Sequence, residues 1–299
     1  MEGKITKKLT LIADSSCDLP VEIIEQYDIE IVPVSIFFPD ETRTQYIDIT
    51  TEEFFKMISE DDLKATTGVP APKRFKQAFD NALEKSEEAI MLTLSKDLSG
   101  IWSSSVLHAK NMTDNKVTVI DDRTTTSPHG LVTMKTARMI EEGLTKEDII
   151  DKLQNEIIPN VQLNAFVGTL KYLKRSGRIA TLQHILGELF HFKPLITIED
   201  GKLESPMRVR GESASMEYLM KLGEKVVKVL PKRETLIILH SRNFEKAKIL
   251  YDFLQNLNYN NLEILTWEIG PAIGVHVGPG ALGLTWVGVS ASELLESDK

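Results

Sequence analysis

The 299-residue sequence has a single cysteine, Cys17, and no CxxC pair. A lone thiol cannot form an internal disulfide, and such sparing use of cysteine is typical of a reducing compartment. The chain also lacks a surplus of cations, since 35 Lys and Arg stand against 44 Asp and Glu and give a net charge of −9. A chain of this charge is poorly suited to neutralising phosphates. We therefore expect a cytoplasmic protein with no nucleic-acid partner.

Long hydrophobic runs and nucleotide signatures are missing as well. The opening residues MEGKITKKLTLIAD contain only a short apolar run that ends at Asp14, which predicts neither a signal peptide nor a membrane span. We expect no stable membrane insertion, although transient membrane contact stays open. No GxxxxGK[ST] or GxSxG motif occurs, and GPGALG at 278–283 lacks the helix, strand and acid that a dinucleotide fingerprint requires after it.

What the sequence does contain is typical of a folded α/β protein. Hydrophobic residues make up 42% and charged residues 26%, and the length favours two domains with a core each. In the first half, β-rich apolar runs alternate with helix-period segments, which predicts parallel strands joined by crossovers. The expected strands are 9–13, 29–37, 89–94 and 116–121, and the expected helices are 20–27, 51–58, 72–85, 98–112 and 127–142, with a further helix at 145–158.

The second half has a different pattern. ITIEDGKLE places Asp-Gly between two alternating runs, which is the clearest hairpin signal in the chain. We therefore predict a layered parallel-sheet domain over 1–160 and a smaller α/β domain over 161–299. The mixed sheet of this second domain is expected to be smaller than the parallel sheet, and its 270–290 segment is expected to return to the ligand cleft. The expected strands of this domain are 161–169, 194–205, 234–241 and 261–270, and the expected helices are 180–190, 213–229 and 244–255.

Hydroxyl side chains gather where the predicted parallel strands end. These turns are DSSCD at 14–18, SKDLSG at 95–100 and DRTTTS at 122–127, and ATTGVPAP at 65–72 is a fourth hydroxyl-rich turn before a helix. Ligands of parallel α/β sheets collect at the carboxyl ends of strands, and freed N–H groups and hydroxyls there can hold a small anion. Helix capping by Ser, Thr and Asp explains any one of these turns equally well.

Two more specific kinds of site, a metal site and a hydrolase triad, can be considered from individual residues. His184, Glu188 and His191 would share one helical face and could ligate a metal, but no second motif supplies further ligands, so we expect no metal and no cofactor. Ser99, His276 and Asp14 could form a hydrolase triad, but no nucleophile elbow is present.

Taken in order, these segments resemble the DegV family of bacterial fatty-acid-binding proteins. The likeness spans nearly the whole chain. It is carried by seven blocks, namely ADSSCDLP, TGVPAP, LSKDLSGIWSSS, VIDDRTTTSPHG, YLKRSGRI, KPLITIEDGKL and GVHVGPGALG.

The resemblance implies a carrier without chemistry of its own. It implies a long-chain fatty acid with its tail in an apolar tunnel and its carboxylate held by Thr67, Ser99 and His276. It also implies a separate fatty acid kinase subunit as partner, which phosphorylates the bound acid with ATP. Arg178 is the candidate for closing the site or docking the kinase. The further ligand-binding residues that we expect from the same blocks are Gly100, Ser15, Thr125 and Gly278.

The sequence departs from the family pattern near the expected head-group site. Gly68 and Val69 follow the threonine where Ser-Gln is usual, Asp97 stands where glycine is common, and Pro128 and His129 replace small residues. We expect glycines 274, 278 and 280 to adopt positive φ, so that His276 reaches the carboxylate from the side opposite Thr67 and Ser99. The alternatives are a small-molecule enzyme, either a hydrolase or a carbonyl-binding kinase subunit that uses Ser99 or His276, and a regulatory protein without a ligand.

Overall fold

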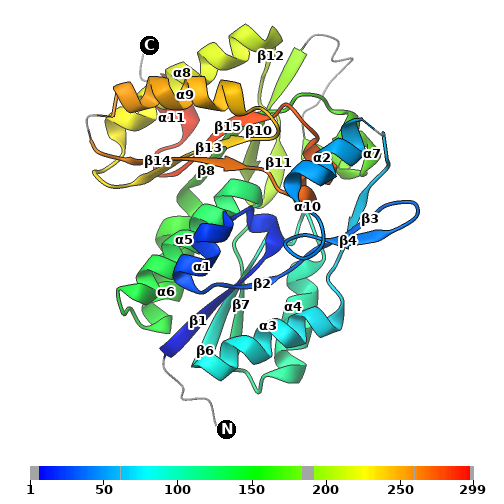
Figure 1. Ribbon diagram of the computed structural model, residues 1–299. Helices are drawn as coiled ribbons and strands as arrows, with labels where there is room; N and C mark the ends of the chain where they lie inside the picture. The colour runs from blue at the N-terminus through cyan, green and yellow to red at the C-terminus, as the bar shows by residue number, and fades with distance from the viewer. Residues whose placement is uncertain (1–6, 61, 184–191, 259, 297–299) are drawn as a thin grey trace.

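The parallel sheet predicted for the first half is present. A computed structural model describes residues 7–60, 62–183, 192–258 and 260–296 (Figure 1). Its first sheet has four parallel strands in the order β2-β1-β6-β7, and these strands are β1 (Lys7–Asp14), β2 (Glu30–Val32), β6 (Ser86–Thr93) and β7 (Val117–Asp121). Parallel strands in this order require crossovers, and the helices between them supply these.

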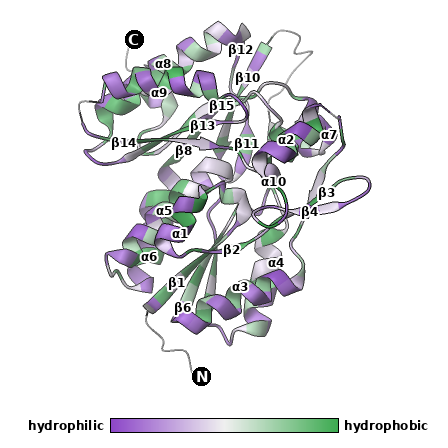
Figure 2. Cartoon of the chain, viewed as in Figure 1, coloured by the Kyte–Doolittle hydropathy of each residue, from purple (hydrophilic) through white to green (hydrophobic). Residues whose placement is uncertain are grey.

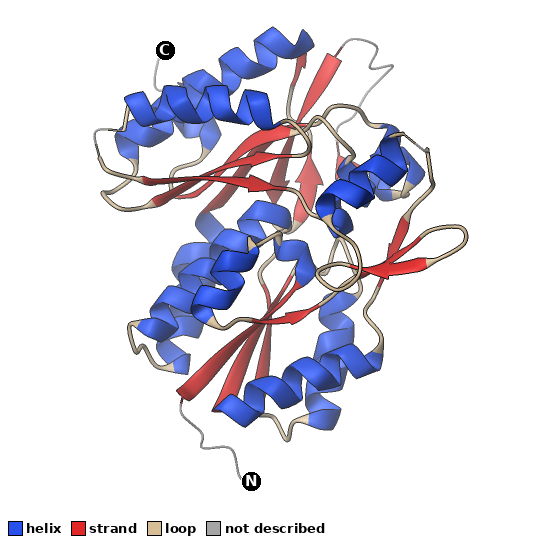
Figure 3. Ribbon diagram, viewed as in Figure 1, coloured by secondary structure: helices blue, strands red, loops and turns tan. Residues whose placement is uncertain are grey.

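Helices cover both faces of this sheet (Figure 3). One face packs on α1 (Val21–Tyr27), α5 (Thr126–Glu141) and α6 (Lys146–Lys152), and the other on α3 (Pro72–Lys85) and α4 (Ile101–Met112). The alternation along β1 decides which side chain meets which layer, because successive residues of a strand point to opposite faces. Leu11 therefore packs with Leu131 of α5, whereas Ile12 packs with Phe75 of α3. Figure 2 shows these strands largely in hydrophobic colours.

The single strand expected over 29–37 is wrong. The segment forms β2 and then β3 (Ser35–Phe37), and β3 belongs to a separate antiparallel sheet with β4 (Thr42–Thr44) and β5 (Thr66–Gly68). Pro33 lies between the two strands and has no N–H for a sheet ladder, which ends the first pairing. Helix α2 (Thr51–Ser59), which begins with a capping box from Thr50 and Glu53, packs beside this small sheet.

The second large sheet is mixed, as predicted, but it is the larger of the two and not the smaller. Its order is β14-β13-β15-β8-β10-β11-β9, and β12 pairs with β10. The sheet has more strands than predicted because several of them leave little signal in the sequence. Strands of two or three residues are too short to show an alternating pattern, and β15 begins within the glycine-rich segment. The strands are β8 (Val161–Phe166), β9 (Leu182–Gln183), β10 (Phe192–Glu199), β11 (Lys202–Glu204), β12 (Arg208–Arg210), β13 (Thr235–His240), β14 (Glu263–Glu268) and β15 (Leu282–Val287).

Local sequence signals in this half are mostly confirmed. Glu199 of β10 pairs with Lys202 of β11 across Asp200 and Gly201, whose φ angles of 50° and 83° are those of a two-residue hairpin turn. The helix expected from residue 180 is wrong at its start, where a 3₁₀ turn (Arg178–Thr181) leads into β9, and residues 184–191 lie outside the described residues. Helices α8 (Gly211–Val229), α9 (Phe244–Asn256) and α11 (Ala291–Glu296) pack against the mixed sheet.

Helix α5 lies between the two large sheets, and its first residues are fully enclosed. Trp267 of β14 belongs to the same core cluster as Leu131 of α5 and Leu11 of β1. At Gly130 a Cβ atom would lie 2.4 Å from the Cys17 carbonyl oxygen and 2.7 Å from the Trp267 ring, so only glycine allows this approach. Cys17 itself is a buried packing residue, as expected. The domain division at residue 160 stays a prediction.

Candidate functional site

A cavity of about 240 Å³ lies where the carboxyl ends of the parallel strands face the mixed sheet. One wall comes from β8, whose alternate residues Leu163 and Ala165 point into it together with Val167 just beyond the strand. Further apolar side chains come from segments far apart in the sequence, namely Val34, Leu94, Leu98, Leu173, Ile196, Leu203, Leu239, Ile269, Ile273, Val277 and Ala281. The cavity is therefore an apolar chamber with a few polar residues in its lining.

Thr67 and His276 form the first polar pair of the cavity. Thr67 lies on β5 and His276 on α10 (Pro271–Val277), and Thr67 Oγ1 lies 3.0 Å from His276 Nε2. The two residues are 209 positions apart in the chain, so only folding brings them together. Both line the cavity, where a hydroxyl and an imidazole can serve as hydrogen-bond partners of a polar ligand group.

The glycine-rich segment around His276 forms the helix α10 as far as Val277. Gly278 and Gly280 have positive φ angles of 67° and 92°, as predicted, but Gly274 lies within α10. The reason for glycine at 274 is space, because a Cβ there would lie 2.6 Å from Phe54 of α2. Gly278 ends the helix against Tyr172, whose ring would lie 2.0 Å from an added Cβ. His276 is thus held on a short helix that is pressed closely against its neighbours.

The environment of His276 keeps its imidazole neutral. Burial lowers its pKa to about 4, and the positive charge of Arg178 acts in the same direction. Its Nδ1 is buried and has no hydrogen-bond partner among the described residues. Arg178 also lines the cavity, and its guanidinium donates to the Ser176 carbonyl at 3.3 Å. A cation beside a neutral donor group makes this part of the cavity suited to an anion.

The start of α4 provides two of the other expected residues. Ser99 and Gly100 both line the cavity, and the Ser99 hydroxyl accepts a long hydrogen bond from the Ile101 N–H at 3.4 Å. Gly100 is the N-cap of α4 and has no side chain to cap it, so beyond the Ile101 N–H no capping side chain occupies the first turn of this 12-residue helix. A Cβ at Gly100 would lie 3.3 Å from Val69, another lining residue.

The remaining expected ligand residues divide between the lining and the core. Thr125, the N-cap of α5, lines the cavity. Ser15 does not, because its hydroxyl is fully buried and accepts from the Val34 N–H at 2.9 Å, while its neighbour Ser16 lines the cavity instead. Gly278 is also outside the lining, and its carbonyl accepts from the Ser241 hydroxyl at 2.7 Å.

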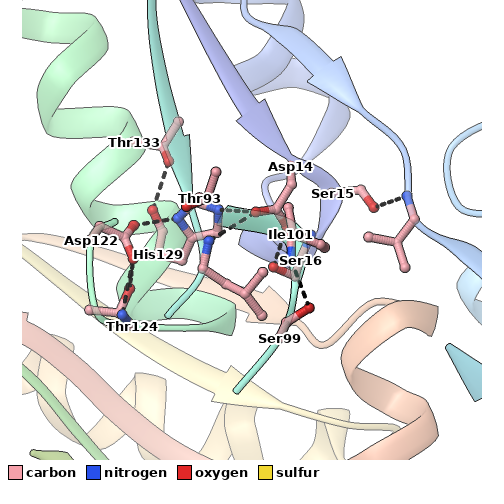
Figure 4. Close-up of polar contacts among 12 residues, drawn as sticks. Asp14, Ser15, Ser16, Thr93, Ser99, Ile101, Asp122, Thr124, His129 and Thr133 are labelled. Carbon is pink, nitrogen blue, oxygen red and sulfur yellow. Dashed lines mark hydrogen bonds and ion pairs between the residues drawn. The ribbon is translucent and has the colours of Figure 1, made fainter. Parts of the chain in front are cut away.

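Beneath the polar turns lies a fully buried charged triad that the sequence analysis did not predict. His129 of α5 contacts Asp122 through Nδ1 and lies 3.5 Å from Asp14 through Nε2, and none of the three is exposed (Figure 4). Burial alone would lower the pKa of His129, but the two carboxylates outweigh it and raise the pKa to about 10. Asp14 also accepts from the Leu94 N–H and from Ser16, so the triad connects three of the turns below the cavity.

The alternative sites from the sequence are not assembled. Asp14 pairs with His129, His276 pairs with Thr67, and Ser99 accepts from the backbone, so the contacts of these three residues join none of them to another. The proposed metal ligands His184, Glu188 and His191 lie outside the described residues. Within the described ranges no group of three His, Cys, Asp or Glu side chains could hold a metal ion, and no helix is long and apolar enough to cross a membrane.

A sequence model described as "Uncharacterised protein, DegV family" matches residues 8–289 of this chain. A DegV domain-containing protein of Caldanaerobacter subterraneus is 31% identical over 282 residues, which cover 93% of this chain and 98% of that protein. The chain belongs to the DegV family. The family expected from the sequence blocks is therefore confirmed.

Solved structures of other DegV proteins have the same fold. One from Thermus thermophilus, described for its fatty acid binding, superposes with a TM-score of 0.84 at 28% identity and covers 94% of this chain and all of its own. A DegV lipid-binding protein from Thermotoga maritima superposes with a TM-score of 0.79 at 27% identity and covers 94% of this chain and 98% of its own. The two-domain α/β fold class expected for this DegV chain is thus shown.

Sequence reasoning missed two lining residues of the DegV cavity. Ser16 was passed over for Ser15, because a local sequence cannot tell which of two adjacent hydroxyls turns inward. Thr126 lines the cavity beside Thr125. Arg178, the candidate for closing the site or docking the kinase, lies in the wall near His276, and its role stays a prediction. Part of the apolar wall was predictable from the sequence, because Leu163, Ala165 and Val167 occupy alternate positions in VQLNAFV and such residues share one face of a strand.

Proposed function

We propose that this DegV chain binds a long-chain fatty acid, with the tail in the apolar cavity and the carboxylate at Thr67, His276 and Arg178. The observation that carries the proposal is the Thr67–His276 pair in the wall of a largely apolar chamber, with a cation beside it. Ser99 and the open N-terminus of α4 supply additional donors in the same lining. The fatty-acid-binding description of the Thermus thermophilus relative supports the same ligand class.

The energetics favour a tail-dominated ligand. At about 0.8 kcal/mol per buried CH₂, fifteen methylenes give a gross gain of roughly 12 kcal/mol before ordering costs. A carboxylate buried without partners would be strongly disfavoured, so it needs hydroxyl, amide or guanidinium donors. The rest of the ligand is apolar, so these donors are needed only at the carboxylate end. The tail therefore supplies affinity and the polar group sets the orientation of the acid.

The chain acts in this proposal as a cytoplasmic carrier that presents the acid to a separate kinase subunit. The family resemblance is the source of the kinase partner and of the acyl phosphate product. The contacts of Ser99, His276 and Asp14 support a carrier over a hydrolase, because among the described residues neither His276 nor Asp14 contacts the serine to activate it. The carboxylate would have to remain reachable by ATP, which is consistent with a head group held by the β5 and α4 turns.

Binding is tested by native mass spectrometry of the protein purified from bacteria, followed by chain analysis of any released lipid. We expect one fatty acid per chain. Thr67→Val should reduce palmitate affinity at least about tenfold, because it removes the hydroxyl that pairs with His276. Thr66→Val, on the exposed face of the same strand, is the matched control and should bind as the wild type does. The proposal would be refuted if the protein neither retained fatty acid through purification nor bound fatty acid added afterwards.

The carrier role needs a separate measurement. Loaded protein is incubated with ATP, with and without a purified bacterial fatty acid kinase subunit, and acyl phosphate is measured. We expect product only when both proteins are present. Hydrolysis or phosphorylation by this chain alone would instead support the enzyme alternative.

A further inference from the structure

Three hydroxyls in the cavity lining form a second polar group, whose hydrogen bonds in the described part of the chain do not include Thr67 or His276. They are Ser16, in the turn after β1, and Thr125 and Thr126, at the start of α5. Such residues at helix starts are ordinarily explained by capping. The structure removes that explanation for Thr125, which is the N-cap of α5 but makes no side-chain capping hydrogen bond.

Thr125 has an unpartnered hydroxyl in a nearly closed environment. The residue is 8% exposed, and its Oγ1 is buried with no hydrogen-bond partner within the part of the chain that the structure describes. A buried hydroxyl without a partner is disfavoured, so a ligand that supplies one binds more favourably. Rotation about χ1 can move the threonine hydroxyl into the position of the methyl group, so the side chain can present a different group to the cavity.

The chemistry around Thr125 disfavours a second carboxylate. The Ser16 hydroxyl donates to Asp14, and the Thr126 hydroxyl donates to Asp18 at 2.7 Å, so both protons are committed to buried acids. These two hydroxyls offer only lone pairs to the cavity, and Thr125 offers both a proton and lone pairs. A neutral donor such as an alcohol fits this group, whereas an anion would face these lone pairs and, behind Ser16, the buried carboxylate of Asp14.

We propose that the cavity prefers a fatty acid that carries a hydroxyl on its tail, and that Thr125 hydrogen-bonds this hydroxyl. The inference rests on the proposed fatty acid binding and specifies its substrate class. The carboxylate of such an acid lies at Thr67 and His276, and the tail hydroxyl replaces the missing partner of Thr125 Oγ1. The lone pairs of Ser16 and Thr126 can accept a hydrogen bond from the same tail hydroxyl, and they disfavour an anion at that position.

The test compares stearate with a panel of stearates that carry one hydroxyl at successive positions along the tail, by competition against a bound fluorescent fatty acid. Wild-type protein should bind the best hydroxystearate about tenfold more tightly than stearate, the gain of a good hydrogen bond to a buried group. Thr125→Val, which keeps the shape, should abolish this preference, so that the best hydroxystearate binds no more tightly than stearate. Thr125→Ser should retain the preference.

The outcomes separate this inference from the proposal on which it rests. Equal binding of stearate and every hydroxystearate by the wild type would overturn it, with fatty acid binding intact. An equal loss of stearate and hydroxystearate in Thr125→Val would overturn it too, and would assign Thr125 to the carboxylate. Failure to bind any acid would refute the proposed function and this inference together. The variant should fold, because it loses no helix cap, and thermal unfolding checks this.

Discussion

Replacing His129 by glutamine tests whether the buried triad holds the turns below the cavity. The imidazole lies between the carboxylates of Asp122 and Asp14, and all three side chains are fully buried (Figure 4). Removal of the cation leaves two buried carboxylates facing each other without compensation. Breaking a buried ion pair in this way costs about 3–5 kcal/mol of unfolding free energy.

The pH dependence of wild-type stability gives a second measurement that needs no variant. Because the folded-state pKa of His129 is raised to about 10, its stabilisation is complete below the unfolded value of about 6.5 and is lost as the pH rises to 10. Between pH 7.5 and 8.5 the folded chain holds one more proton than the unfolded chain. The unfolding free energy should therefore fall by about 1.4 kcal/mol over that one pH unit.

Between pH 7.5 and 8.5 the pH dependence of the unfolding free energy comes mainly from His129, because the other groups with shifted pKa values titrate largely outside this interval. Burial raises the pKa of Asp18 to about 7, so its contribution falls mainly below the interval. Burial raises the pKa of Cys17 well above its usual range, so its contribution is lost as the unfolded thiol ionises, which begins at about pH 8.5 and falls mainly above the interval. His276, whose pKa is lowered to about 4, matters below pH 6.5.

Urea unfolding followed by circular dichroism measures both effects. The matched control is His108→Gln, a half-buried histidine on α4 beside Phe75, which should cost under about 1 kcal/mol and keep the wild-type pH slope. His129→Gln should lose the slope. The reasoning is refuted if His129→Gln costs less than about 1 kcal/mol, or if wild-type stability is flat between pH 7.5 and 8.5.

Three further outcomes are expected. Ser99→Ala should weaken palmitate binding about three- to tenfold in a displacement assay with unchanged thermal stability, and unaltered affinity would exclude the α4 turn from the head-group site. Gly278→Ala should cost at least about 2 kcal/mol in urea unfolding, because φ is 67° and the new Cβ meets Tyr172; a neutral result would contradict the close packing of α10. Palmitate affinity should be independent of pH between 6 and 8 if His276 stays neutral, and a sharp fall across that range would show that the imidazolium binds the acid.

The helices, the hairpin and the polar turns were readable from local sequence. Strand and helix periods repeat over a few residues, and Asp200-Gly201 specifies its turn by backbone preference alone. The turns rich in hydroxyls after β1 and β7 were recognised for the same reason, because strand ends and helix starts have short signatures. The family blocks added the expectation that Thr67, Ser99 and His276 share a site.

Only the tertiary structure decided how these residues meet. Thr67 and His276 pair across 209 residues, and the choice between Ser15 and Ser16 depends on a hydrogen bond that Ser15 accepts from Val34, in the segment between β2 and β3. The burial of His129 between two acids depends on how α5 packs beneath the mixed sheet. The sequence determined the local elements and the chemistry at their ends, because those depend on neighbouring residues. The direction of each side chain depends on long-range packing, which no short stretch of sequence contains.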